Sequence, residues 1–107
     1  MFASTSITDT TWRLLWAHTA HLVINELPES ASTERVSAGL GWGIRRKDNP
    51  RQAILIHPTA NQREVGDLSL TVLGQGTQVI PRAGRSYTDY IEMVVDAAEA
   101  AQRYYLC

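Results

Sequence analysis

The short spacing of the extended apolar runs in the middle of this chain limits its fold more than any other feature. Four runs between residues 36 and 80 alternate apolar with polar side chains or are rich in β-formers, which is typical of strands. They cover residues 36–45, 52–57, 68–73 and 77–80. The segments between them are shorter than the dozen or more residues that a parallel crossover needs, so we expect the strands to pair antiparallel.

A helical pattern flanks this strand region on each side. In the N-terminal segment, apolar residues recur on one broad helical face after a capping residue, Thr8 or Asp9, and Pro28 ends the helix. In the C-terminal segment, Ser86 followed three residues later by Asp89 resembles a capping box and starts a second amphipathic helix. We therefore predict an α+β fold in which an N-terminal and a C-terminal helix pack on one face of a four-stranded antiparallel sheet.

The length of the chain fits one domain with one core. With 107 residues, we expect a single compact domain that spans residues 1–107. The apolar faces of the predicted helices and strands supply its core. We expect this core to contain Trp12, Trp16, Val23, Leu40, Trp42, Ile54, Leu70, Ile91 and Val94.

Cysteine content and the lengths of the apolar runs bear on where the protein works. The one cysteine, Cys107, is the last residue, so we expect no disulfide within the chain, which suits a reducing compartment. The N-terminus lacks the cationic start and apolar run of a secretory signal, and no apolar run reaches the length of a membrane span. We expect a soluble, cytoplasmic protein without membrane contacts.

Three glycines at every second position, Gly39, Gly41 and Gly43, stand inside the first predicted strand. A phosphate-binding glycine loop leads from a strand into a helix, whereas here a turn and another strand follow, which argues against a phosphate loop. A glycine stripe exposes bare backbone on one side of a strand and allows close approach. A packed helix, a neighbouring subunit and a ligand all remain open as the group that approaches it.

Residues that could carry catalysis or bind metal are few. His18, His21 and His57 could in principle form a three-histidine metal site, but the His-x-x-His spacing is a weak signal, and ordinary polar roles are the better interpretation. No Gly-x-Ser-x-Gly motif is present, and Cys107 lacks the surroundings of a catalytic thiol. We expect a protein that is not an enzyme and that uses no metal or cofactor.

The basic residues of the chain gather around one predicted turn. The net charge is −1, yet residues 35–63 hold six basic and one acidic side chain. The turn at 47–50 is surrounded by four of these bases, which we predict to form a partner-binding hairpin: Arg45, Arg46, Lys47 and Arg51. A protein partner with an acidic surface fits this hairpin. Nucleic acid is the less favoured partner, because no exposed aromatic side chain accompanies the bases and the pI is about 6.3.

A second cluster of bases precedes the C-terminal helix. Arg82 and Arg85 stand just before Ser86, where guanidinium groups and the unpaired N–H groups of a helix start could together bind a phosphate or carboxylate. The alternative is that both arginines are solvated or pair with nearby acids, and this alternative is favoured because surface ion pairs contribute little.

Apolar residues outside the core stripe predict self-association. Leu15 and Leu22 form a second, narrower strip on the N-terminal helix, and Tyr104 and Tyr105 lie near the end of the chain. Two helices on one sheet face do not need this additional apolar surface, so we expect it to form the interface of a homodimer.

Together these patterns predict a small non-enzymatic binding module that acts through protein–protein contact. Stoichiometric inhibitors and adaptors of phages and mobile elements are often compact proteins of this kind, and that class is our base-rate expectation. The first alternative is a nucleotide or small-anion binder that uses Arg82, Arg85 and the helix N-terminus. The second alternative is a nucleic-acid binder that uses the basic hairpin.

Overall fold

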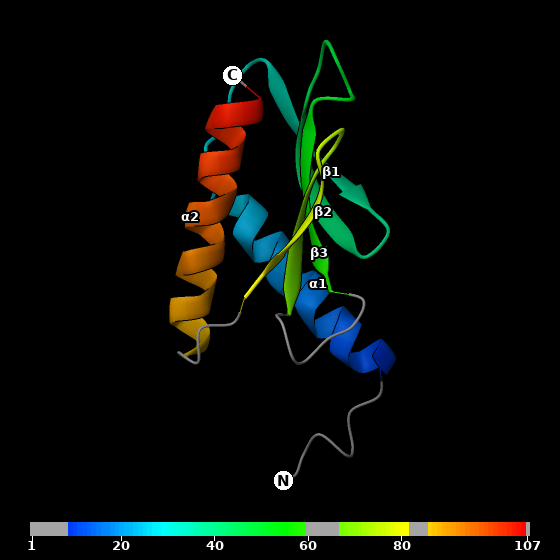
Figure 1. Ribbon diagram of the computed structural model, residues 1–107, viewed down its shortest axis with the longest axis vertical. Coiled ribbons are helices and arrows are strands. Elements are labelled where there is room, and N and C mark those ends of the chain that lie inside the picture. Colours follow the sequence, from blue (N-terminus) through cyan, green and yellow to red (C-terminus); the bar gives the residue numbers. More distant parts are fainter. Residues whose placement is uncertain (1–8, 60–66, 82–85, 107) are drawn as a thin grey trace, which may run out of the picture.

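The fold is an antiparallel sheet covered by two helices (Figure 1). The computed structural model describes residues 9–59, 67–81 and 86–106. Its elements, in chain order, are α1 (Asp9–Asn25), β1 (Thr33–Ala38), β2 (Gly41–Arg46), β3 (Ala53–Pro58), β4 (Leu68–Val72), β5 (Gly76–Ile80) and α2 (Tyr87–Tyr105). The strands lie in the order β1-β2-β3-β4-β5, and every neighbouring pair is antiparallel. The α+β class and the antiparallel pairing are therefore confirmed.

The prediction of four strands is wrong, because the run at residues 36–45 is a hairpin of two strands. Ala38 pairs with Gly41, which leaves Gly39 and Leu40 as a two-residue turn. Gly39 has φ of 59°, and a positive φ at the first turn residue favours glycine because it has no Cβ. Leu40 sits at the turn with 39 % of its surface exposed, so its assignment to the core is also wrong.

The turn also changes which side of the sheet β1 presents to the helices. Arg35 pairs with Ile44, whose side chain is buried beneath the helices, whereas a single strand would have placed Arg35 on the glycine side. The Arg35 guanidinium donates to the carbonyl oxygen of Leu27 at 3.1 Å and lies 3.3 Å from the Glu29 carboxylate. Arg35 therefore binds the chain where it leaves α1, at the end of the helix that favours a cation.

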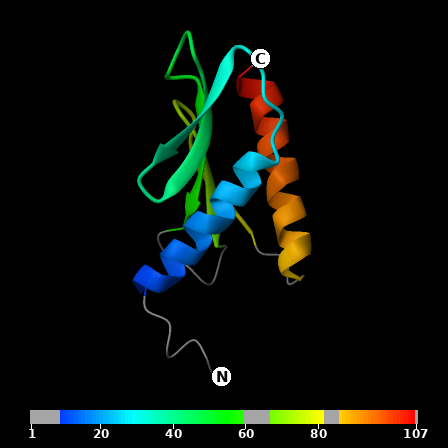
Figure 2. The same ribbon diagram turned by 180° about the vertical axis from the view of Figure 1, so that it is seen from behind.

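Both helices lie on the same side of the sheet, as the two opposite views show (Figures 1 and 2). Helix α1 packs against β2 and β3, and α2 packs against β3 and β4. Strand β3 thus lies beneath both helices, while β1 and β5 form the two edges of the sheet. The layers enclose one apolar cluster, to which both helices and strands β2 to β5 contribute.

Most of the predicted core is confirmed. Five of the nine predicted residues are buried in the cluster: Trp16, Val23, Ile54, Leu70 and Val94. Trp42 and Ile91 are half-buried and pack against it. The side chain of Trp12 lies outside the described part of the structure. Periodicity thus located the buried stripe of α1, because residues three and four apart share one helix face.

The N-terminal turn of α2 is anchored by its cap and by an aromatic cluster. The Ser86 hydroxyl accepts a hydrogen bond from the backbone N–H of Asp89 at 3.2 Å, which confirms the predicted cap. One turn into the helix, the Tyr90 hydroxyl accepts a hydrogen bond from the N–H of Leu68 at 3.1 Å. Trp16 of α1 packs edge-on against Tyr90, with ring centroids 5.6 Å apart. These contacts join α1, α2 and β4 at one end of the core.

Candidate functional site

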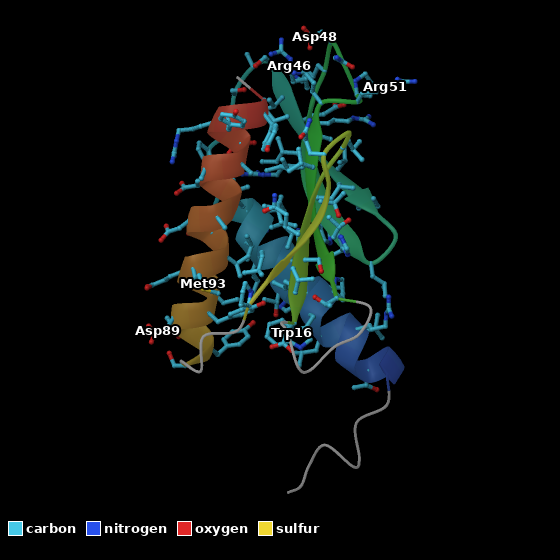
Figure 3. All side chains as sticks on the ribbon, in the orientation of Figure 1. Trp16, Arg46, Asp48, Arg51, Asp89 and Met93 are labelled. Carbon is cyan, nitrogen blue, oxygen red and sulfur yellow. The ribbon has the colours of Figure 1, made fainter. Side chains whose placement is uncertain are left out.

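The basic hairpin lies at the β2–β3 turn, where Arg46, Asp48 and Arg51 are labelled in Figure 3. Arg45 donates to the Glu34 carboxylate at 2.8 Å, and Arg46 binds both carboxylate oxygens of Asp48 at 2.9 Å. Two of the four predicted partner-binding cations are therefore paired within the chain. Lys47 and Arg51 are exposed. Local pairing reduces the positive potential that the hairpin offers to a partner.

The pair of Arg46 and Asp48 also stabilises the turn itself. The hydrogen bonds from Arg46 lower the pKa of the Asp48 carboxyl below its usual value of 3.8. Arg46 donates a further bond, of 3.4 Å, to the carbonyl oxygen of Leu106 beyond the end of α2. The guanidinium thus connects the hairpin to the C-terminal end of the helix layer, which is a structural role.

The glycines of β2 are required by the neighbouring strand. A Cβ on Gly43 would clash with the Leu55 side chain and with the Ile54 carbonyl oxygen. A Cβ on Gly41 would lie 2.9 Å from the Cβ of His57, also on β3. Both glycines alternate with Trp42 and Ile44, which face the helices, so they lie on the opposite sheet face. Within the described structure, side chains of β3 occupy the space beside these glycines, and no helix approaches them.

The three histidines do not come together. His21 stacks on Trp42, with ring centroids 4.1 Å apart, and His18 is exposed on α1. His57 lies on the other face of the sheet and is hydrogen-bonded to the Thr71 hydroxyl at 2.7 Å. In the described ranges, no three His, Cys, Asp or Glu side chains are grouped so that they could hold a metal ion.

The predicted anion site falls largely outside the described residues. Arg82 and Arg85 both lie there, and only Ser86, the capping residue of α2, is described. Binding of an anion at this helix start therefore stays a prediction.

The residues predicted to form a dimer interface belong to two different surfaces. Leu15 and Leu22 are exposed on α1, by 52 % and 40 %, and Leu22 lines a groove between α1 and α2. Tyr104, exposed by 79 %, and the half-buried Tyr105 line a groove on the other flank of α2, against β4 and β5. These four residues therefore do not lie on one continuous surface of the monomer.

The groove between α1 and α2 is lined by apolar side chains, which we call its floor, and by exposed acidic side chains, which we call its rim. Its volume is about 490 Å³. Leu22, Ile91 and Val95 supply the apolar side chains, and the remaining lining residues are Asn25, Glu26, Glu92 and Asp96. No Lys, Arg or His is among the residues that line it. We call this surface the acidic groove.

The positions of two hydroxyls fix the spacing of the helices at one end of the acidic groove. The Thr19 hydroxyl of α1 and the Tyr87 hydroxyl of α2 are hydrogen-bonded at 2.8 Å, and Thr19 is fully buried. In the sequence, Leu22 precedes Glu26 by four residues and Glu92 precedes Asp96 by four, and this spacing puts the members of each pair close together on one helix. What the sequence did not show was that these two strips face one another.

Two further hollows border the helix layer. One, of about 440 Å³, lies beside the C-terminal end of α2 and is lined by residues of both charges, including Glu29, Arg46, Glu99 and Arg103. The other, of about 400 Å³, lies between α2 and the last two strands and is mostly apolar. Neither has the one-sided charge of the acidic groove.

Comparison of the chain with family models, with curated proteins and with solved structures finds no match. Within the described residues, neither helix combines the length and the apolar character needed to cross a bilayer.

Proposed function

We propose that this protein is a non-enzymatic binding module whose acidic groove takes up a basic, amphipathic helical segment of a partner protein. The observation that carries the proposal is the composition of the groove, with Leu22, Ile91 and Val95 on the floor and three carboxylates on the rim. Amphipathic helices bind other proteins by laying their apolar face into such grooves. Basic residues on the flanks of the incoming helix would lie beside the carboxylates.

The two kinds of side chain in the groove would contribute differently. Leu22 keeps 40 % of its surface exposed and Ile91 is half-buried, so a partner helix would remove further apolar surface from water, the main source of affinity. Glu26, Glu92 and Asp96 are exposed, and exposed charges act mainly on association rate and orientation. The rim thus selects for a basic partner, and the floor retains it.

This proposal places recognition at the helix layer and not at the hairpin. Arg45 and Arg46 already bind carboxylates of the same chain, which weakens the case for an acidic protein or a nucleic acid at that end. An acidic groove repels phosphate, so a nucleotide would have to bind elsewhere, and Arg82 and Arg85 stay the candidates for that alternative function.

A designed peptide tests the proposal directly. The probe is a fluorescein-labelled helical peptide with leucines along one face and lysines on both flanks, and its control carries glutamates in place of the lysines. Fluorescence anisotropy should show binding of the lysine peptide and none of the glutamate peptide. Affinity for the lysine peptide should fall steadily with added salt.

A matched pair of leucine variants locates the binding surface. Leu22→Ala should weaken peptide binding by about three- to eightfold, because burying a whole leucine side chain contributes about 1.5–3 kcal/mol, the exposed 40 % of Leu22 corresponds to about 0.6–1.2 kcal/mol, and about 1.4 kcal/mol is a factor of ten. Leu14→Ala is the control, since Leu14 is 55 % exposed on the same helix but does not line the groove. Equal binding of both peptides, or equal loss in both variants, would refute the proposed function.

A further inference from the structure

Strand β5 is an edge without the usual protection against pairing. Gly76, Thr77, Gln78 and Val79 are all exposed, and in the described part of the chain no strand lies beyond them. Proteins commonly guard such edges with lysine, proline or bulges, yet the strand GTQVI contains no charged residue and no proline. The opposite edge, β1, is different, because Glu34 and Arg35 on it are engaged in ion pairs.

Apolar surface flanks the β5 edge on both sides of the sheet. Val79 is 41 % exposed and pairs with Ser69 on the face opposite the helices. On the helix side, Gln78 lines the groove of about 400 Å³ together with Leu70, Ala97 and Tyr104. Helix α2 packs mainly against β3 and β4 and reaches the Ile80 end of β5, the yellow strand in Figure 1, through the Tyr90 hydroxyl, whereas residues 76–79 of this strand are exposed. The edge is thus accessible from both faces.

We propose that β5 pairs antiparallel with β5 of a second copy of this chain, about a two-fold axis at Gln78, which joins two five-stranded sheets into one. In this register Thr77 lies opposite the partner's Val79, a pair of β-branched residues of the kind that stabilises antiparallel strands. Gly76 lies opposite the partner's Ile80. The backbone N–H and C=O groups that point away from β4 acquire partners in this way.

A second copy fits this edge better than an unrelated strand for reasons of symmetry and charge. An antiparallel pair of identical strands is related by a two-fold axis, so the assembly closes as a dimer. The absence of charge on β5 removes the like-charge repulsion that identical strands would otherwise meet across the axis. The two apolar grooves at Tyr104 would then adjoin on the helix side, so the dimer would cover the most exposed large apolar side chain among the described residues.

Sedimentation velocity at rising protein concentration tests the dimer. The wild-type chain should change from monomer to dimer, and both Val79→Lys and Thr77→Lys should raise the dissociation constant by at least about tenfold, because lysine on an edge strand blocks strand addition. Ser37→Lys, on the exposed part of the β1 edge, is the matched control and should dimerise as the wild type does. Circular dichroism establishes that each variant is folded.

Three outcomes would overturn the proposal: a wild-type chain that stays monomeric up to hundreds of micromolar, lysine variants of β5 that dimerise normally, or an equal loss in Ser37→Lys. The register has its own test in a Cys107→Ser background. Gln78→Cys should form an intermolecular disulfide on mild oxidation, since Cα atoms across a strand pair lie about 4.5–5.5 Å apart and disulfides span about that distance. A dimer in which this cysteine does not cross-link would rule out the axis at Gln78.

The dimer does not depend on the acidic groove, and the two sets of experiments separate them. Val79→Lys should bind the lysine peptide as the wild type does, because Val79 lies on the sheet face away from α1 and α2. Leu22→Ala should dimerise normally, since Leu22 lies on α1 and does not line the groove beside β5. Failure of either proposal therefore leaves the other intact.

Discussion

Replacement of Trp16 by alanine should remove a large share of the stability of this domain. Trp16 is 4 % exposed and contacts the rings of Tyr87 and Tyr90, at centroid distances of 6.0 and 5.6 Å. Truncation of a buried tryptophan to alanine costs about 3–5 kcal/mol, in which transfer and cavity contributions combine. Aromatic pairs add about 0.5–1.5 kcal/mol beyond the area that they bury, which favours the upper part of that range.

Urea unfolding followed by circular dichroism measures this loss. For an m-value of about 2 kcal/mol per molar, a loss of about 4 kcal/mol lowers the midpoint by about 2 M. A domain typically has a free energy of unfolding of about 5–15 kcal/mol, so we expect Trp16→Ala to leave only a weakly folded chain. Trp16→Phe retains a ring and should cause a smaller loss. Leu14→Ala is the exposed control and should change stability by less than about 0.5 kcal/mol. A Trp16→Ala midpoint equal to that of Leu14→Ala would show that the assigned core face of α1 is wrong.

Three further predictions concern the turns and edges of the sheet. Gly43→Ala should lower the melting temperature by more than Gly39→Ala. The methyl group at residue 43 would clash with the backbone of β3, whereas the one at residue 39 only strains a turn at positive φ. The reverse order of melting temperatures would contradict the pairing of β2 with β3. Arg35→Gln should cost about 1 kcal/mol in urea unfolding, since a carbonyl group at the end of α1 loses its donor, and an unchanged midpoint would show that water replaces the guanidinium. Asp48→Asn should be less stable than the wild type near neutral pH, because the pKa of Asp48 is lowered in the folded state. The difference in stability should vanish as the pH falls below the usual value of 3.8 and through the folded-state pKa. A difference that persists in strong acid would exclude the bond to Arg46 as its cause.

The sequence predicted the helices and the pairing sense of the strands because those features depend on local signals. Periodic apolar residues mark a helix face, and Ser86 marks the start of α2. The turn at Gly39 was missed because apolar residues continue at every second position through it, from Val36 to Ile44, so that the two strands together resemble one. A two-residue turn pairs odd-numbered residues of one strand with even-numbered residues of the next, and paired residues point to the same face of the sheet. Arg35 and Ile44 share a face for this reason.

The acidic groove could be predicted only in halves. The sequence placed Leu22 with Leu15 on a narrow apolar strip of α1, and the four-residue spacing of Glu92 and Asp96 puts these carboxylates on one face of α2. Their opposition depends on how α1 and α2 cross the sheet, which results from packing on β3 and from contacts such as the bond between Thr19 and Tyr87. Neither helix pattern contains that information, because each describes one element alone. The ion pair of Arg45 and Glu34 could not be predicted for a related reason, since the two residues meet only through the pairing of β1 with β2.

The strict neighbour-to-neighbour order of the strands has a consequence for how the chain folds. Because each strand pairs with the one that precedes it, the sheet can grow hairpin by hairpin, and each step closes only a short loop. Sheets that join distant segments fold slowly, because the entropy cost of closing long loops comes before the contacts that stabilise the sheet. Here the contacts of longest range in sequence are those between α1 and α2, and we expect the rate of folding to respond most to substitutions at residues that join these helices, such as Thr19 and Tyr87.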